Sequence, residues 1–147
     1  MLESLDELVS VNQNLYRRYQ QELEGIPGVQ LIEYDETEAC NYQYIVVEID
    51  DSATVVSRDQ ILKILWAENV LARRYFFPGC HRMEPYRSLF PDAGLSLSET
   101  ERLLTRVLCL PTGSDVKSSE VVKICQLIRL IVEKSGQVTE NLARPRN

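Results

Sequence analysis

The sequence predicts an α+β fold in which helices pack on one face of a small, mostly antiparallel sheet. The chain has 147 residues, of which 44% are apolar, and this size and composition fit one compact domain. Stretches with the apolar spacing of a helix are interspersed with short runs rich in β-branched and aromatic residues. Their order, α, β, β, α, β, α, α, favours helices on one face of the sheet. We expect a single small domain over residues 1–136, followed by a frayed tail at 137–147.

The first helix is predicted over residues 5–23, where apolar side chains recur at spacings of three and four. The turn GIPG at 25–28 ends it, because glycine suits the left-handed position after a helix and proline cannot continue one. Residues 29–34 and 42–49 carry β-branched and aromatic side chains and flank the acidic loop DETEACN. We expect two neighbouring strands, and solvated acidic side chains in the loop rather than metal ligands.

The middle of the chain opens with a second predicted helix that begins at a capping box. The Ser57 hydroxyl accepts a hydrogen bond from an orphan backbone amide in this motif, and the Gln60 side chain reaches back. Residues 71–77 are predicted to form a third short strand, which Pro78-Gly79 ends. The segment Cys80–Leu95 is predicted to be a long loop with room for one helical turn. Loops of this length inside a compact domain are usually functional or disordered, and the aromatic content argues against disorder.

Two further helices are predicted towards the C-terminus. A second capping box, Ser96–Glu99, opens a helix that reaches about Leu108, and the sequence CLPTG at 109–113 breaks it. The last helix is predicted from Ser119 to Lys134, with Ser118 as its cap and apolar side chains on one broad face. This face is expected to contact the core.

The charge of the chain limits its partners. The formal net charge is −6, with acidic and basic residues interspersed, so no basic surface is expected to follow a phosphate backbone. No apolar run approaches the roughly twenty residues of a membrane span, and the N-terminal residues are acidic, unlike a signal peptide. The sequence therefore predicts a cytoplasmic protein that binds neither nucleic acid nor membrane. Its four cysteines show no CxxC spacing and are expected to be reduced.

The only histidine lies in the most crowded segment, RRYFFPGCHRMEPY at residues 73–86. Cys80 and His81 could be drawn as a thiol and base pair or as half of a metal site. Adjacent residues of an extended segment point apart, however, and two side chains are far fewer than the four ligands of a zinc site. We predict no catalytic residue and no metal ligand.

Four stretches of the sequence together resemble one known family. They are NLYRRYQQELEGIPGV at 14–29, SRDQILKILWAENVLARRYFFPGCHRMEPY at 57–86, and SETERLLTRVLCLPTG followed by SSEVVKICQLIRLI within 98–131. In this order and with these gaps they resemble the small C-terminal domain of the DegT/DnrJ/EryC1/StrS sugar aminotransferases. The resemblance implies the C-terminal domain of the aspartate-aminotransferase-like fold and a nucleotide-linked deoxysugar as substrate of the complete enzyme.

The resemblance also implies pyridoxal phosphate (PLP) as cofactor of the complete enzyme. In the family a large N-terminal domain binds PLP and supplies the Schiff-base lysine, and this chain is expected to begin where that domain ends. Its four lysines lie in or beside predicted amphipathic helices, without the family's sequence context: Lys63, Lys117, Lys123 and Lys134. No cofactor-binding residue is predicted, and the chain alone is expected to be inactive.

The resemblance points to four candidate substrate-binding residues, namely Arg74, Tyr75, Phe77 and His81. An arginine can fork onto a diphosphate, and an aromatic face can stack on a base or cover a sugar. The competing interpretation is that Tyr75 and Phe77 alternate from a strand into the core while the arginines face water. For His81, a hydrogen bond that orders the loop is equally compatible with the sequence.

Two functions stay open from the sequence. The chain is either the C-terminal domain or a fragment of a nucleotide-sugar aminotransferase, contributing substrate contacts, or a non-catalytic binding or oligomerisation module derived from that domain. In both cases apolar surface that faces the large domain in the family would be uncovered. We therefore expect a homodimer or an assembly with a separately encoded PLP-binding large domain.

Overall fold

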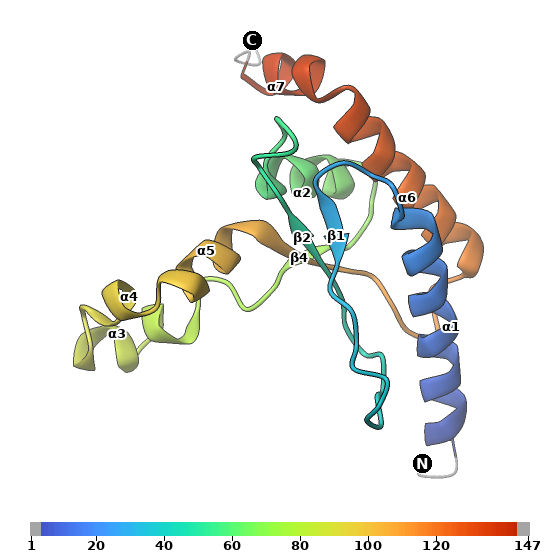
Figure 1. Cartoon of the computed structure of the whole chain (residues 1–147), viewed down its shortest axis with the longest axis horizontal. Coiled ribbons are helices and arrows are strands. Elements are labelled where there is room, and N and C mark those ends of the chain that lie inside the picture. The colour runs from blue at the N-terminus through green and yellow to red at the C-terminus, as the bar shows by residue number, and fades with distance from the viewer. Residues whose placement is uncertain (1–3, 144–147) are drawn as a thin grey trace.

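The computed structural model describes residues 4–143, and four strands of this range form one sheet in the order β1-β2-β4-β3 (Figure 1). The strands are β1 (Val29–Leu31), β2 (Ile45–Ile49), β3 (Arg73–Arg74) and β4 (Val107–Leu110). Every pair of neighbours is antiparallel. The predicted α+β class and the antiparallel sheet are therefore confirmed.

Three helices cover one face of this sheet and enclose the core. They are α1 (Leu5–Leu23), α2 (Arg58–Ala67) and α6 (Ser118–Glu133). Figure 1 shows α1 and α6 side by side along the sheet, and the two helices are in contact. Alternate residues of β2 point into this layer, and Ile45, Val47 and Ile49 are almost completely buried there. Leu108 and Leu110 of β4 belong to the same cluster, whereas Val46, Val107 and Cys109 are buried outside it and belong to the opposite face.

The opposite face is only partly covered, by helix α5 (Ser98–Arg106). Between β3 and α5 the chain forms three short helical elements, η1 (Cys80–Arg82), α3 (Tyr86–Leu89) and α4 (Ala93–Ser96). Residues 80–97, called the arm below, project away from the sheet (Figure 1). The arm replaces the predicted loop with one helical turn, so the segment is more regular than the sequence indicated.

The strand β4 was not predicted. The preceding helix was predicted to reach about Leu108, but α5 ends at Arg106 and β4 follows without a loop. All four residues of β4 are buried, because the strand pairs with β2 on one side and β3 on the other. A continuous apolar run of this kind has no period of two, so the sequence alone cannot distinguish it from a buried helix.

The three strands that were predicted are shorter in the structure. The predicted strands 29–34, 42–49 and 71–77 shorten to three, five and two residues. Beyond these limits the residues leave the sheet for loops in which side chains satisfy part of the backbone: the Tyr34 amide, for example, donates to the Tyr16 hydroxyl.

Helix starts were predicted with mixed success. At α2 the capping box is confirmed, because Ser57 Oγ accepts from the Gln60 amide at 3.3 Å and Gln60 Oε1 accepts from the Ser57 amide at 2.8 Å. The box predicted at Ser96–Glu99 is absent, since α5 follows Leu97 without a side-chain cap. At α6 the cap position is Lys117, one residue before the predicted one, and the Glu120 carboxylate accepts from its amide.

The structure describes part of the tail that was predicted to fray. Helix α7 (Ser135–Ala143) continues the chain beyond α6. The Val138 amide donates to the Lys134 carbonyl, and the Val138 side chain packs against the core cluster, so burial holds a segment of weak periodicity. Residues 144–147 lie outside the described part of the chain. No helix within residues 4–143 combines the length and apolar character that crossing a membrane requires.

Candidate functional site

Arg74 and Phe77 lie together beside helix α2. The Arg74 guanidinium is 5.0 Å from the centroid of the Phe77 ring, and its Nε donates to Asp59 Oδ1 at 2.9 Å. Arg74 is thus both stacked on an aromatic face and paired with a carboxylate. The Phe77 ring is 51% exposed and sits in the turn after β3, so the interpretation that Phe77 alternates from a strand into the core is wrong.

Arg58 binds the same carboxylate as Arg74, that of Asp59. Its side chain is only 2% exposed, and its guanidinium donates to the Val107 carbonyl oxygen and to Asp59 Oδ1, each at 2.7 Å. Burial lowers the pKa of Arg58. Burial alone would raise the pKa of Asp59, but the hydrogen bond from Arg74 and the charge of Arg58 outweigh it and leave that pKa lowered. The Asp59 carboxylate therefore forms ion pairs with both Arg58 and Arg74, at the point where the chain leaves β3.

Tyr75 points to the other side of the sheet. Its ring is 5.6 Å from the ring of Tyr44 and 4.4 Å from that of Phe76, measured between centroids. Burial raises the pKa of Tyr75. The three rings contribute to a groove of about 420 Å³ between the open sheet face and α5. The other residues that line this groove are Ile32, Glu33, Tyr34, Val46, Thr100, Leu103, Leu104 and Val107.

His81 lies at the base of the arm. Its Nε2 is 2.7 Å from Glu101 Oε1 on α5, and the Arg82 Nε donates to the same oxygen at 2.8 Å. The hydrogen bond from Arg82, and then that from His81, hold the pKa of the Glu101 carboxyl below its usual range. The hydrogen bond that orders the loop, one of the two roles considered for His81, is thus present.

Gly79 permits this close approach. It has a φ of +97°, which favours glycine, and a Cβ at this position would lie 2.7 Å from Leu104 Cδ1 and 2.8 Å from His81 Cε1. A side chain at residue 79 would therefore push the base of the arm away from α5.

The four predicted residues thus fall into three places. Arg74 and Phe77 are in contact, Tyr75 faces the groove, and His81 contacts α5. Tyr44 and Phe76, which also line the groove, were not among the predicted site residues. Phe76 stands between two predicted residues and could have been included, whereas nothing in the sequence brings Tyr44, some thirty positions earlier, next to Tyr75.

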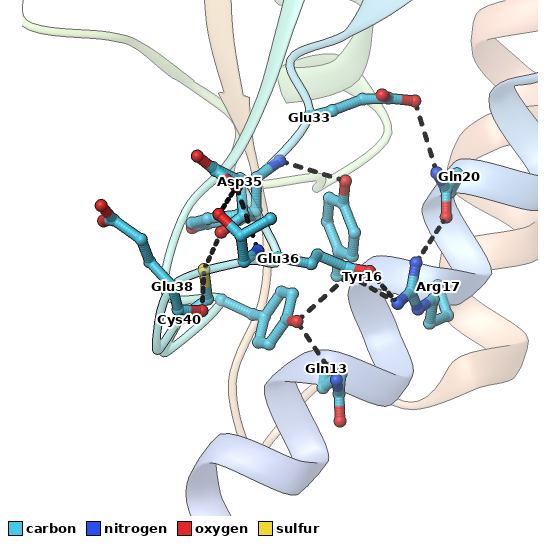
Figure 2. A network of polar contacts seen from close by, with 12 residues as sticks. Gln13, Tyr16, Arg17, Gln20, Glu33, Asp35, Glu36, Glu38 and Cys40 are labelled. Atoms are coloured by element: carbon cyan, nitrogen blue, oxygen red, sulfur yellow. Dashed lines mark hydrogen bonds and ion pairs between the residues drawn. The ribbon is translucent and has the colours of Figure 1, made fainter.

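The acidic loop between β1 and β2 is tied to helix α1. Figure 2 shows the Glu36 carboxylate beside Arg17, and the Tyr16 hydroxyl accepting from a backbone amide of the loop. Arg17 donates to the Glu36 carboxylate at 2.6 Å. Asp35 Oδ1 accepts from the Thr37 hydroxyl and amide. These carboxylates have local partners. Within residues 4–143 no group of three or more histidine, cysteine or acidic side chains could hold a metal ion.

The described lysines do not suit a PLP Schiff base. Such a lysine must be deprotonated near neutral pH, which requires burial or a cationic neighbour. All four lysines of the sequence are exposed on or beside α2 and α6. The four cysteines are free, and Cys80 is exposed beside His81 without a hydrogen bond to it in the described residues.

These features define a small α+β domain of the fold-type I, PLP-dependent aminotransferases. The chain belongs to the DegT/DnrJ/EryC1/StrS aminotransferase family, whose model matches residues 1–129. PLP is the cofactor of this family.

Individual relatives agree with this assignment. A dTDP-4-amino-4,6-dideoxy-D-glucose transaminase of Escherichia coli is 35% identical over 115 residues, which are 78% of this chain and 30% of the relative. The crystal structure of DesI in the presence of its TDP-sugar product superimposes with a TM-score of 0.88 and 36% identity, over 97% of this chain and 36% of DesI. DesV of S. venezuelae, with 22% identity and a TM-score of 0.78, shares the fold. The chain thus spans about a third of the length of these relatives.

Proposed function

We propose that the chain serves as the C-terminal domain of a PLP-dependent nucleotide-sugar aminotransferase and contributes substrate contacts but not the Schiff-base lysine. The observation that carries this proposal is the likeness to DesI, a structure determined with its TDP-sugar product, at 36% identity over almost the whole chain. The exposed lysines support the second half of the proposal, because none is placed for covalent bonding to a cofactor.

The residues proposed to contact substrate are those of the turn after β3 and of the base of the arm. Phe77 and Tyr75 offer aromatic faces for a base or a sugar, and the two lie on opposite sides of this turn. Arg74 has only part of its guanidinium engaged by Asp59 and keeps donors for an anionic diphosphate. His81 is assigned a substrate-facing role through its second ring nitrogen, because Nε2 is held by Glu101.

A non-catalytic binding or oligomerisation module is the second candidate. The observation in its favour is the arm, on which several large apolar side chains are exposed, such as Leu89, Phe90 and Leu95. A surface of this kind serves association whether or not the assembled protein catalyses a reaction.

Grafting the chain into a relative distinguishes the two candidate functions. In the E. coli transaminase, the part that this chain matches is replaced with the chain, and amino transfer is measured with dTDP-4-amino-4,6-dideoxy-D-glucose. The first candidate predicts measurable turnover with PLP bound to the host part. It also predicts that Phe77→Ala or Tyr75→Ala raises KM about tenfold, which corresponds to one lost stacking contact.

Leu71→Ala is the matched control, since Leu71 is 80% exposed and lies outside the candidate site. Its KM should equal that of the unmodified graft. A folded graft that binds PLP but shows no amino transfer would favour the non-catalytic module.

A further inference from the structure

Arg73 of β3 differs from most arginines of this chain in having no carboxylate partner. Within residues 4–143, every arginine other than Arg73 and Arg129 forms an ion pair with an acidic side chain. Arg129 instead donates to two backbone carbonyls. In a chain with a formal net charge of −6, an exposed arginine without an acidic partner is the exception.

Arg73 lines a pocket of about 700 Å³ at the end of the sheet where β3 begins and β4 ends, called the Arg73 pocket below. Among the described residues of this lining, Arg73 is the one that carries a charge, and none is acidic. Neutral side chains with hydrogen-bond donors stand around it, namely Asn12, Gln43, Tyr44 and Thr112. An anion in this pocket meets a positive charge and no carboxylate that repels it.

The Arg73 guanidinium lies at the β4 wall of the pocket. Arg73 pairs with Cys109 across the β3–β4 ladder. Burial raises the pKa of the Cys109 thiol, and the Ile45 backbone and the charge of Arg73 act against this rise. Thr112 Oγ1 is buried without a hydrogen-bond partner in the described part of the chain, and a bound anion would offer it an acceptor.

Tertiary hydrogen bonds hold the walls of the pocket. On one side, Asn12 Nδ2 of α1 donates to the Asn41 carbonyl at 3.3 Å and fixes the loop before β2. On the other side, the buried Tyr19 hydroxyl donates to the Pro111 carbonyl at 2.9 Å and fixes the end of β4. The pocket therefore exists before a ligand arrives, and binding costs little ordering of the chain.

We propose that the Arg73 pocket binds a small organic anion, a molecule that carries a phosphate or a carboxylate on an apolar body. The guanidinium can fork onto either group, and the Tyr44 ring, Pro111 and Val116 offer apolar surface to the body. The lining contains none of the four predicted substrate-binding residues, so this inference goes beyond the proposed function and does not rest on it.

Titration of the chain alone with phenyl phosphate, benzoate and benzyl alcohol tests this inference, with backbone amide NMR as the readout. At least one of the two anions should shift the amides of Gln43 and Gly113 saturably, with a Kd of about 1 mM or lower. The more tightly bound anion identifies the group that the pocket prefers. Benzyl alcohol has a similar ring without a charge and should cause no saturable shift there. Equal binding of benzyl alcohol, or no saturable shift with either anion, would overturn the proposal.

Substitution of Arg73 locates the site. Arg73→Gln should raise the Kd at least about tenfold, because it removes the charge and the forked hydrogen bonds. Arg73→Lys keeps the charge without the fork, so its Kd should lie between those of the wild type and Arg73→Gln. Arg87→Gln is the matched control, since it removes the same charge from an exposed arginine of the arm. Its Kd should stay within about twofold of the wild type in 0.15 M salt.

The variants are expected to fold, because Arg73 is exposed and forms no ion pair in the described residues. The melting temperature of Arg73→Gln should stay within about 2 °C of the wild type. If it falls further, the comparison of wild type with Arg73→Lys decides. An unchanged Kd in the Arg73 variants would contradict the site, as would shifts spread evenly over several arginines. Because the chain alone is titrated, these outcomes do not depend on amino transfer by the graft.

Discussion

The Arg58 guanidinium donates a 2.7 Å hydrogen bond to the Val107 carbonyl oxygen and so joins the first turn of α2 to the first residue of β4, 49 positions later in the chain. The same guanidinium binds Asp59, which in turn binds Arg74. One buried side chain therefore links the core layer to the turn that carries the candidate substrate contacts.

Replacing Arg58 with methionine is expected to lower the free energy of unfolding by about 2–4 kcal/mol, because it leaves a buried carbonyl and part of Asp59 unpaired. Urea denaturation measures this loss. Arg102→Met is the control: Arg102 is more exposed and pairs with Glu48 and Glu99, so its loss should cost less than about 1 kcal/mol. Equal losses in the two variants would argue against a special role of Arg58.

The contacts of Glu101 with the base of the arm should depend on pH. The pKa of the Glu101 carboxyl is held below its ordinary value of 4.5 by Arg82 and His81. A carboxyl whose pKa is lower in the folded state contributes stability that is present above its unfolded value and is lost as the pH falls through the folded pKa. The amides of Arg82 and Met83, which donate to the Gly79 and Cys80 carbonyls, should lose protection, corrected for intrinsic exchange, as the pH drops below 4.5.

Glu101→Gln provides the comparison for this pH dependence. The variant has no carboxyl to protonate, so exchange at Arg82 and Met83 should be fast and constant across the same pH range. A wild-type profile as flat as that of the variant would show that Glu101 does not hold the arm.

The cysteines should differ in reactivity according to burial. Burial raises the pKa of the Cys109 thiol, and it raises the pKa of the Cys125 thiol to about 12. Cys80 is exposed. Iodoacetamide at pH 8 should therefore modify Cys80 first and leave Cys109 and Cys125 untouched until urea is added, as mass spectrometry of peptides would show. Modification of Cys125 at the rate of Cys80 would contradict the described core.

Tyr19→Phe is expected to destabilise the chain by about 1–2 kcal/mol, because the Tyr19 hydroxyl is the donor to the Pro111 carbonyl at 2.9 Å and the ring is fully buried. Burial also raises the pKa of this hydroxyl, in line with a neutral donor. The midpoint of urea unfolding reports the change. Tyr86→Phe, at an exposed ring of the arm, should shift the midpoint by no more than the error of the measurement.

Much of the fold follows from local signals. Helix α1 ends where glycine and proline stop it, and α2 begins at a capping box whose two hydrogen bonds join residues only three positions apart. Such contacts join residues that are close in sequence, so a local sequence pattern predicts them. Strand β4 has no such signal, because its strand character comes from pairing with β2 and β3 rather than from its own pattern.

The candidate site, like the fold, was only partly predictable from the sequence. The sequence singled out Arg74, Tyr75, Phe77 and His81 by composition and family resemblance, and their substrate roles stay predictions. It could not indicate that a positive φ at Phe76 accompanies a turn with Tyr75 and Phe77 on opposite sides. Nor could it indicate that Asp59 would hold Arg74, since this ion pair joins two elements that only the folded sheet brings together.

By itself, then, the amino-acid sequence determined the α+β class, the limits of α1, the start of α2 and the family, because these depend on periodicity, capping and motifs within short stretches of chain. Only the tertiary structure decided that residues 107–110 are a central strand, that Arg58 joins α2 to β4, and that the arm leaves the body with its apolar side chains uncovered. The physical reason is that pairing, burial and exposure depend on segments distant in sequence, and no local pattern encodes which of them meet.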